Sequence, residues 1–395
     1  MTEQLFPKKL EEISQYNWTN LEVPSEIGNY KKVIIGVNTI FVIDDNDELW
    51  AWGSNDYNKL GLSNEAMKEY TGRDAVKLFI KDLNNNTVKV SHVYSWYAVT
   101  FVISTTNDVY VAGSNNHGTA GINSDLETIN TFQKVAGLPS GEEIQCIYSD
   151  TPHGNTSLSN RIIIVMENGD IYSAGDSMLG KTSKIFTKII SNSDIYNKYN
   201  SNVRKAIYAN ALYNHNVALV ILLENGNLYW IQYKNSEIVF NKIEEFSENV
   251  KDISYLYTKS PLIVETIDNK FYYCGMKTLD LINFGLDENL LTEVINGTQV
   301  MKDFIDLEEV LPSKMFENND SIKKIMNGSQ AADGTTNFFY IMNSGKVWGS
   351  GSIKRLGLGN EYISNANSTT TTEIILIAGG NEALSNLKDI KIKDF

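Results

Sequence analysis

The amino-acid sequence predicts an all-β fold, a β-propeller of four-stranded antiparallel blades. Three observations favour this class: a repeat of about 59 residues, a tight polar turn inside each repeat, and almost no helical periodicity. The stretch from Leu5 to Gln15 is the main helix candidate. A four-stranded sheet with two apolar faces cannot cover both of them alone, so we expect successive sheets to stack around an axis.

Six units in the chain share one order of segments. A short apolar run is followed by a loop, a second apolar run, a tight polar turn and an aromatic-rich strand. An Asn-Gly pair between two apolar runs is a strong hairpin signal, and it predicts a type I′ turn. A further apolar run, such as 76–80 or 132–135, precedes each unit as its fourth strand. The units begin at residues 31, 89, 143, 203, 250 and 322, and the clearest turns are Asn168-Gly169, Asn225-Gly226, Asp268-Asn269 and Ser344-Gly345.

The spacing of the repeats favours seven blades over six. Five repeat intervals separate Gly53 from Gly349, and the remaining path through both termini is about 100 residues, closer to two intervals than to one. The last blade is then a composite of both termini, in which residues 387–395 pair with strand material before residue 24, and no sheet edge stays exposed. Six full blades with a partial or open seventh are the alternative. We divide the chain into an N-terminal extension, 1–18, and a propeller, 19–395.

A glycine-containing motif ends the aromatic strand in several units. It reads Trp52-Gly53-Ser54-Asn55 with Leu60-Gly61, Ala112-Gly113-Ser114-Asn115 with Ala120-Gly121, and Trp348-Gly349-Ser350-Gly351 with Leu356-Gly357. These segments resemble the WGxNxxGQLG signature of the regulator-of-chromosome-condensation family, whose fold is a seven-bladed propeller. The resemblance covers residues 19–395 and is strongest in the first two units and the last.

The resemblance implies a propeller that binds protein partners, and in part of the family nucleotide exchange on a small nuclear GTPase. In that family the loop after the first strand of each blade carries a glycine followed by a histidine. The equivalent loops here, such as 37–39 and 94–97, lack this pair, which argues against the exchange activity. The same fold serves many unrelated partners, so the motif indicates the fold more than the function.

Charge argues against nucleic acid as a partner. The formal net charge is −14, and a site for a phosphate backbone needs a local basic stripe to overcome such a field. The basic pairs Lys8-Lys9, Lys31-Lys32 and Lys323-Lys324 are scattered along the chain. We therefore expect no nucleic-acid binding.

The N-terminus and the cysteines give further expectations. The first residues contain no apolar core typical of a signal peptide, and no apolar run is long enough to cross a bilayer. We expect cytoplasmic synthesis without a signal peptide, and no membrane insertion. Cys146 and Cys274 lie far apart without a CxxC partner, which predicts two buried free thiols rather than a bridge, and no cysteine-rich zinc site.

The sequence contains no signature of catalysis, metal binding or a cofactor. No phosphate-binding loop or nucleophile motif is present, and the histidines have no partner at metal-ligand spacing. Asp44, Asp45 and Asp47 form the densest acidic cluster, but they occupy a hairpin-turn position, so we interpret them as a solvated turn rather than a calcium loop. We expect no enzymatic activity and no cofactor. The four histidines are His92, His117, His153 and His215.

Aromatic and polar side chains in the loops after the first strands are the candidate ligand-binding residues. Tyr, Trp and Asn supply rigid, amphipathic contact area at low entropic cost and dominate recognition surfaces. They also suit sugars, whose CH faces stack on aromatic rings. The alternative is that some of them pack in the channel or between blades. The candidates are Tyr94, Trp96, Tyr97, Asp150, Tyr213, Asn214 and Tyr257.

Together these features predict a non-catalytic recognition scaffold. The favoured interpretation is a receptor-binding propeller of a bacterial or phage-type particle or surface system, with a protein or cell-surface glycan as ligand. Residues 1–18 would attach it to a larger assembly, and the protein would be associated with the virion or particle. The alternative is an intracellular protein-binding regulator that resembles guanine-nucleotide exchange propellers. A secreted, inhibitor-like propeller is a third hypothesis, and the missing export signal weighs against it.

Overall fold

The computed structural model describes residues 24–378 with gaps. Within this part the chain forms six four-stranded antiparallel sheets and one separate two-stranded hairpin. Strands that follow one another in the sequence are neighbours in each sheet, apart from the hairpin inserted in the fifth. The fold is therefore an all-β propeller with six described blades. The longest gaps in the description are 150–160, 210–217, 275–292, 328–337 and 353–369.

The strands of the six blades are short, and most blades pair all four in sequence order. Blades 1 to 3 contain β1 (Tyr30–Gly36), β2 (Thr39–Asp44), β3 (Leu49–Gly53), β4 (Val76–Leu78), β5 (Val90–Ser95), β6 (Val99–Ser104), β7 (Val109–Ser114), β8 (Thr128–Lys134), β9 (Ile144–Ser149), β10 (Arg161–Met166), β11 (Ile171–Asp176) and β12 (Thr182–Ile190). Blades 4 to 6 contain β13 (Val203–Ala209), β14 (Ala218–Leu223), β15 (Leu228–Lys234), β16 (Glu237–Lys242), β17 (Val250–Tyr255), β18 (Leu262–Thr266), β19 (Phe271–Cys274), β22 (Ile305–Asp306), β23 (Ile322–Asn327), β24 (Phe338–Met342), β25 (Val347–Ser352) and β26 (Thr370–Ala378).

Little else in the described chain is regular. A hairpin of β20 (Glu293–Ile295) and β21 (Thr298–Val300) lies between β19 and β22 in sequence. The α-helices are α2 (Asn64–Glu69), α3 (Asn192–Tyr199) and α5 (Leu307–Val310). The 3-10 helices are η2 (Ser25–Ile27), η3 (Asp56–Asn58), η4 (Asn116–Gly118), η5 (Glu244–Phe246), η7 (Ser313–Met315) and η8 (Glu317–Asn319).

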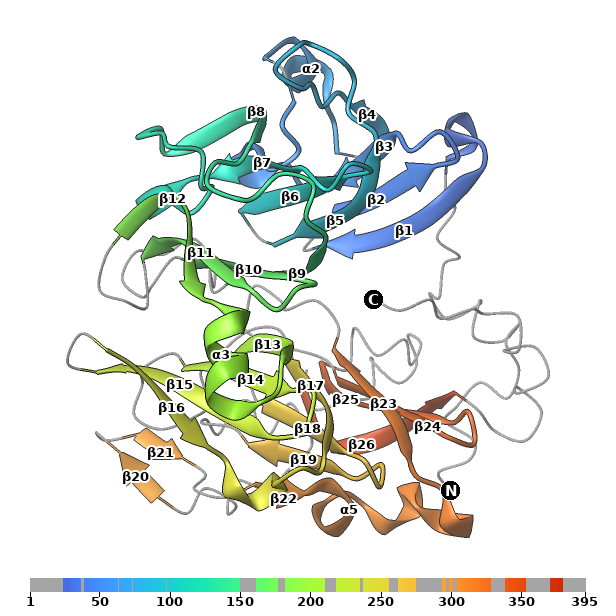
Figure 1. The fold of residues 1–395 in the computed structure, drawn as a ribbon. Helices are drawn as coiled ribbons and strands as arrows, with labels where there is room; N and C mark the ends of the chain where they lie inside the picture. Colours follow the sequence, from blue (N-terminus) through green and yellow to red (C-terminus); the bar gives the residue numbers. More distant parts are fainter. Residues whose placement is uncertain are drawn as a thin grey trace.

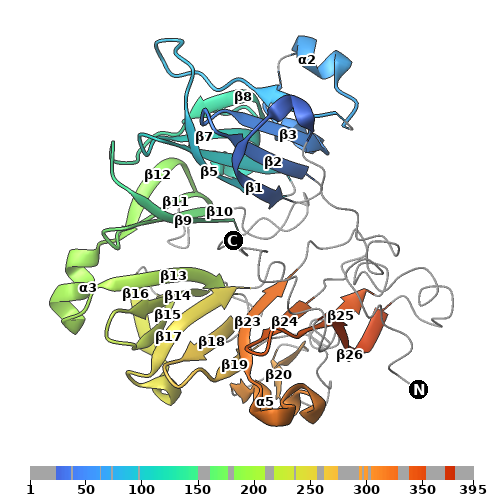
Figure 2. The same ribbon diagram turned by 90° about the vertical axis from the view of Figure 1, so that its right-hand side faces the viewer.

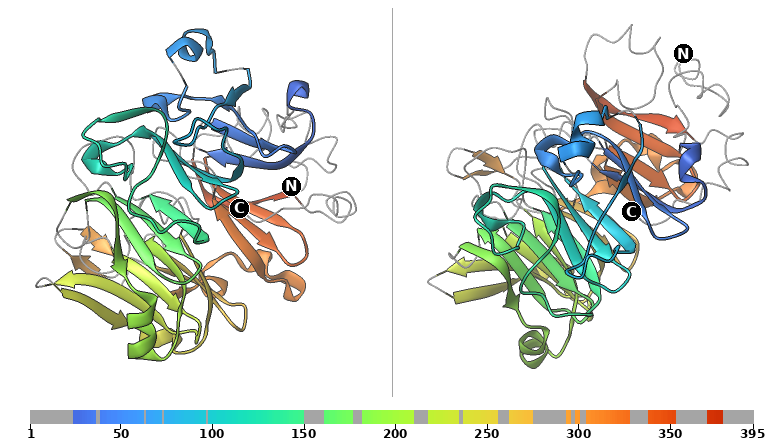
Figure 3. Two further views of the ribbon diagram at one scale, coloured as in Figure 1. Left: turned by 45° about the horizontal axis from the view of Figure 1, so that its top comes forward. Right: turned by 90° about the horizontal axis from the view of Figure 1, so that it is seen from above.

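The blades follow one another around a common centre in chain order (Figures 1 and 2). First strands such as β1, β9 and β13 lie nearest to this centre and fourth strands such as β8, β12 and β16 lie toward the outside (Figure 2), and Figure 3 shows the ring from two further sides. First strands of successive blades touch, as β1 does with β5 and β13 with β17. The first strands therefore form the inner wall of the ring.

The hairpin between the second and third strands has one geometry in all six blades. In each turn the amide of the fourth residue donates to the carbonyl of the first, and the amide of the first donates to the carbonyl of the fifth. One residue per turn has positive φ, from 60° to 86°. This is a type I turn followed by a left-handed residue, so the position of each turn is confirmed and the type I′ prediction is wrong. The left-handed residues are Asp47, Asn107, Gly169, Gly226, Asn269 and Gly345.

Each fourth strand pairs with the aromatic strand that precedes it in the sequence. Leu78 of β4 lies opposite Leu49 of β3, and Lys134 of β8 lies opposite Tyr110 of β7. The sequence-based assignment of these runs to the unit that follows them is therefore wrong by one blade. The physical reason is that this pairing covers the edge that the aromatic strand would otherwise expose.

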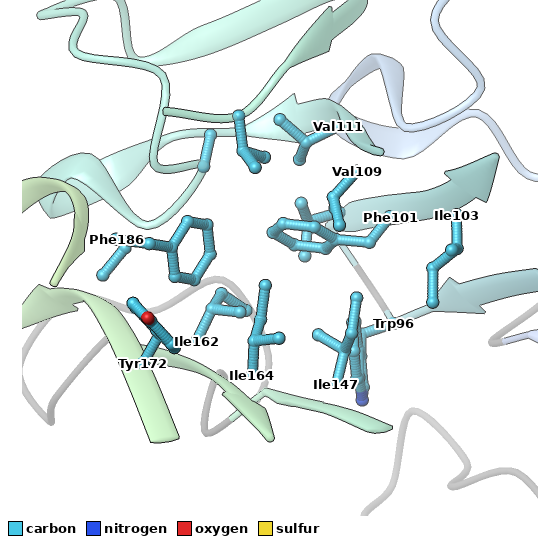
Figure 4. Packing of buried hydrophobic residues seen from close by; sticks show 14 of the residues in the cluster. Trp96, Phe101, Ile103, Val109, Val111, Ile147, Ile162, Ile164, Tyr172 and Phe186 are labelled. Carbon is cyan, nitrogen blue, oxygen red and sulfur yellow. The ribbon is translucent and has the colours of Figure 1, made fainter. Parts of the chain in front are cut away.

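Apolar clusters lie between successive blades rather than within a single sheet. Each of five clusters combines side chains of two neighbouring blades. Between blades 2 and 3, the rings of Phe101 and Phe186 meet edge to face with centroids 6.5 Å apart, and Ile162 and Ile164 pack beside them (Figure 4). Each blade is thus covered by the next, as the stacking argument predicted.

Blades 1 and 6 each carry one apolar face that no described blade covers. Phe101 and Ile163 are at most 1% exposed, whereas Phe339, at the equivalent position of blade 6, is only half-buried. Trp50 of blade 1 is likewise half-buried, while its equivalent Tyr110 is 2% exposed. The expected seventh blade, built from residues 387–395 and those before residue 24, lies outside the described residues.

The glycine-containing motif stabilises the contact between successive blades. In blades 1 and 2 an asparagine closes the loop, since Asn55 Oδ1 accepts from the Leu60 amide at 2.7 Å and Asn115 Oδ1 from the Ala120 amide at 2.9 Å. Gly121 ends the second copy with φ +67°, so close to the ring of Phe186 in blade 3 that a Cβ would lie 2.4 Å from it. Only glycine fits both the backbone angle and the space.

The cysteines and the helices of the described residues bear on two further predictions from the sequence. Cys146 and Cys274 are free thiols, as predicted, with Cys274 buried and Cys146 half-buried. In the described part of the chain, no helix is long and apolar enough to cross a membrane.

Gly121→Ala is expected to destabilise the protein more than Gly141→Ala. Both glycines have positive φ, +67° and +77°, so the two substitutions share a backbone penalty of about 1 kcal/mol. Only at Gly121 does a Cβ meet another group, the ring of Phe186, which adds a packing cost of roughly 1–3 kcal/mol. Urea unfolding measures both variants, and equal midpoints would contradict the role assigned to the motif.

Candidate functional site

The structure describes two of the seven predicted ligand-binding residues, Tyr94 and Trp96. Both belong to the segment that runs from β5 toward β6. The remaining five, Tyr97, Asp150, Tyr213, Asn214 and Tyr257, lie outside the described residues.

Trp96 is part of the core between blades 2 and 3. Its side chain is 9% exposed and belongs to the same cluster as Phe101, whose ring it meets edge to face at 6.2 Å (Figure 4). Its backbone carbonyl faces the buried ammonium of Lys59 at 3.5 Å. Trp96 therefore packs between two blades, which is the alternative to a ligand-binding role that the sequence left open.

Tyr94 is half-buried and packs against the same cluster. Its ring stacks on Trp96 at 6.2 Å and lies 4.6 Å from the ring of His92. Burial raises the pKa of the Tyr94 hydroxyl, which bonds to the backbone of Ile147 in blade 3. Tyr94 and Trp96 therefore join neighbouring blades, and a ligand would reach only the part of Tyr94 that remains exposed.

Asp44 closes a hairpin turn and is not a solvated side chain. It is 4% exposed; its Oδ1 accepts from the Asn46 and Glu48 amides at 2.8 and 2.9 Å, and its Oδ2 accepts from Trp50 Nε1 at 3.0 Å. Burial acts to raise the pKa of Asp44, but these hydrogen bonds together lower it. The turn position was predicted correctly, and the solvation of Asp44 was not. Among the described residues, no group of three or more His, Cys, Asp or Glu side chains could hold a metal.

Every described blade has a β-bulge at the same place on its inner strand. The first residue of the strand pairs with the first residue of the hairpin turn, the second is skipped, and pairing resumes at the third. In β1, for example, Tyr30 lies opposite Asp44 and Lys32 opposite Ile43, so Lys31 is the extra residue. A bulge re-aims side chains locally, and here it does so at one end of the inner wall in all six blades.

The residues at these bulges form a set that we name the bulge ring. It comprises the skipped residue and the one after it in each inner strand. Seven of the twelve are Lys or Arg and one is acidic, in a chain with only 34 Lys and Arg in 395 residues. The members are Lys31, Lys32, Ser91, His92, Gln145, Cys146, Arg204, Lys205, Lys251, Asp252, Lys323 and Lys324.

The bulge carbonyls also join neighbouring blades. A skipped residue leaves its carbonyl out of the sheet ladder, and in two of the six bulges a side chain from the preceding blade donates to this carbonyl. Lys32 Nζ donates to Ser91 O at 3.1 Å, and Gln145 Nε2 donates to Arg204 O at 2.7 Å. The bulge ring is therefore held in place by contacts between blades.

Lys32 also contacts His92, whose ring is kept neutral by its surroundings. Burial, with a smaller effect of Lys32, lowers the pKa of His92 from 6.5 to about 4. Lysine has no acceptor, so the His92 Nδ1 that lies 3.4 Å from Lys32 Nζ is the acceptor of this contact.

Stability is expected to depend on His92 between about pH 6.5 and pH 4. In this range the unfolded chain takes up a proton that the folded imidazole does not, so the contribution of neutral His92 to stability is lost as the pH falls. His92→Asn removes this titration, and its free energy of unfolding should fall less steeply with decreasing pH than that of the wild type. Denaturant unfolding at several pH values measures both, and parallel curves would contradict the assignment.

Comparisons with known proteins show the fold. No family model matches the chain, and no curated protein matches it. Among solved structures, Prp20p from Saccharomyces cerevisiae superposes with a TM-score of 0.58 at 14% identity, over 90% of this chain and 78% of that one. The fold is similar to that of RCC1-type β-propellers. Human WBSCR16 gives 0.56 at 12% identity over 88% and 82%, and yeast RCC1 (Prp20) bound to Kap60 gives 0.56 at 12% over 90% and 76%.

The similarity agrees with the family resemblance of the glycine-containing motif. The matched proteins are RCC1-type propellers, and their level of identity, 12–14%, establishes the architecture alone. The bulge ring could not be inferred from single motifs. Its signal in the sequence is the recurrence of basic pairs one or two positions into the first apolar run of a repeat, as in Lys31-Lys32 and Lys323-Lys324.

Proposed function

We propose that this protein is a non-catalytic propeller that binds a protein partner through one face of the ring. The observation that carries the proposal is the bulge ring. The inner strand of each described blade has a bulge at the same step, and the side chains at this step vary among the blades. A constant backbone that displays variable polar side chains is the arrangement expected of a recognition surface on a rigid scaffold.

The structural neighbours support a protein as the partner. The structure of Prp20p is described together with its binding properties to Gsp1p and histones, and yeast RCC1 was solved bound to Kap60. Those partners are properties of those proteins. For this chain they support the class of ligand, a folded or extended protein segment, and not its identity.

A more specific form of the proposal is a receptor-binding role on a bacterial or phage-type particle or surface system. Its support is the sequence: aromatic and amide residues in the loops after the inner strands, and an N-terminal segment, 1–18, that could attach to an assembly. In this form the ligand is a surface protein or glycan of the target cell.

Affinity capture on the immobilised chain tests the proposed function. Bacterial surface fractions and cell lysates are passed over it, and bound material should be displaced by excess free chain and lost after protease treatment of the fraction. Protease-resistant binding that periodate oxidation abolishes would contradict a protein partner and favour a glycan. The absence of any displaceable partner would contradict the proposal. Acceleration of labelled-nucleotide release from a captured GTPase would instead favour the regulator alternative.

We also infer that a seventh blade, built from both terminal segments, closes the ring. The uncovered faces of blades 1 and 6 support it, because half-buried apolar residues such as Trp50 and Phe339 stand where other blades have fully covered ones. Residues 387–395 and 19–23 are the strand-like segments that remain to cover them.

Deletion of residues 387–395 is therefore expected to destabilise the protein, whereas deletion of 1–18 is not. The first deletion leaves two apolar faces open, and the second removes only the predicted extension. Thermal unfolding should show a melting temperature several degrees lower for the first variant. Equal melting temperatures of wild type and both variants would contradict closure by the termini.

A further inference from the structure

We propose that the bulge ring binds an acidic segment of the partner protein, entering at the end of the inner wall where the hairpin turns lie. The inference rests on the proposed function and specifies the chemistry of its ligand. It is carried by the balance of charge at the bulges and by the different charge of the turns around them.

The bulge ring is more basic than its local carboxylates can neutralise. Three of its cations have a carboxylate partner: Lys31 pairs with Asp47 at 2.6 Å, Lys205 with Asp252 at 2.8 Å and Lys251 with Glu265 at 2.6 Å. For the other four, the described residues provide no carboxylate within ion-pair distance. These four are Lys32, Arg204, Lys323 and Lys324.

Of these four, Lys32 already donates to Ser91 O and contacts His92, so Arg204, Lys323 and Lys324 are the cations that a ligand would pair with first. Lys32, Arg204 and Lys323 are exposed and Lys324 is half-buried. They come from blades 1, 4 and 6, and the backbone beneath them is fixed by the ladder and by the contacts of Lys32 and Gln145 with neighbouring bulges. Because the supporting backbone is already ordered, a ligand would need to order only the ends of the side chains.

In blades 1, 3, 4 and 5, the hairpin turns and the residues just before the inner strands carry the opposite charge. Each turn lies beside the start of an inner strand, because the amide of its second residue donates to the residue before that strand, as Asp45 N does to Asn29 O and Glu167 N to Glu143 O. Exposed carboxylates gather there. They are Asp45, Glu142, Glu143, Glu167, Glu224, Glu248 and Asp268.

This distribution of charge favours a narrow ligand directed at the centre of the face over a wide ligand lying across it. A nucleic acid that lay across the face would bring its phosphates against the acidic turns and against a net charge of −14. A single extended chain directed at the centre of the face would meet the cations of the ring first. Its carboxylates could then form charge-assisted hydrogen bonds with guanidinium and ammonium groups, and bidentate ones with Arg204. An acidic protein segment fits these conditions better than a nucleic acid does.

Fluorescence anisotropy with a labelled oligoglutamate peptide tests the inference on the full chain. The peptide should bind at low salt and dissociate as salt rises. Lys323→Gln with Lys324→Gln should weaken binding roughly tenfold, and Arg204→Gln should weaken it further. The matched control removes two exposed lysines that are not members of the ring, Lys68→Gln with Lys81→Gln. It changes the net charge equally and should alter the affinity by less than about twofold.

Four results would overturn the inference. One is equal weakening by the two double variants, which would show attraction to net charge alone. Another is no peptide binding by the wild type. The third is tighter binding of a single-stranded oligonucleotide of equal charge, which would favour a nucleic acid as ligand. Undiminished capture of a protein partner by the Lys323→Gln/Lys324→Gln variant would reject the bulge ring as the site and leave the proposed function intact.

Discussion

The structure depends on apolar contact between the faces of successive sheets. No blade has a core of its own, because residues such as Phe101 and Phe186 are buried only by the partnership of two blades. Burial of a large aromatic side chain contributes on the order of 2–3 kcal/mol, so each interface gains stability from many such groups. The hairpin turns and the bulges recur at the same positions of the strands in every described blade. Their geometry is regular because the packing beneath them is regular.

Much of the architecture was predictable from the sequence because periodic signals act locally. The turn positions follow from short polar segments between apolar runs, and all six are observed. The turn type was not predictable from Asn168-Gly169 or Asn225-Gly226, because only the glycine of each pair takes a left-handed conformation. In three other turns Asp47, Asn107 or Asn269 takes it instead. The pairing partner of each fourth strand could not be predicted either. It depends on which edge of the neighbouring sheet would otherwise stay exposed, and no single sequence segment encodes that.

The candidate site was harder to predict, since exposure depends on the neighbouring blade. Trp96 is of a residue type that is common in recognition surfaces, yet its side chain is buried and packs against Phe101. Conversely, Lys31-Lys32 and Lys323-Lys324 are hundreds of residues apart in sequence and resemble scattered pairs. A bulge at the same step of each inner strand gives them equivalent places in the ring. Bulges of this kind are difficult to predict from the amino-acid composition of a strand.

The order of the blades has a consequence for biosynthesis. Successive described blades pack against one another, so an interface can form as soon as two consecutive repeats have left the ribosome. Local assembly of this kind limits how long apolar strands stay uncovered during translation. The β20–β21 hairpin lies between β19 and β22 without separating them in their sheet, so added sequence at that point delays the fifth blade without changing its partners.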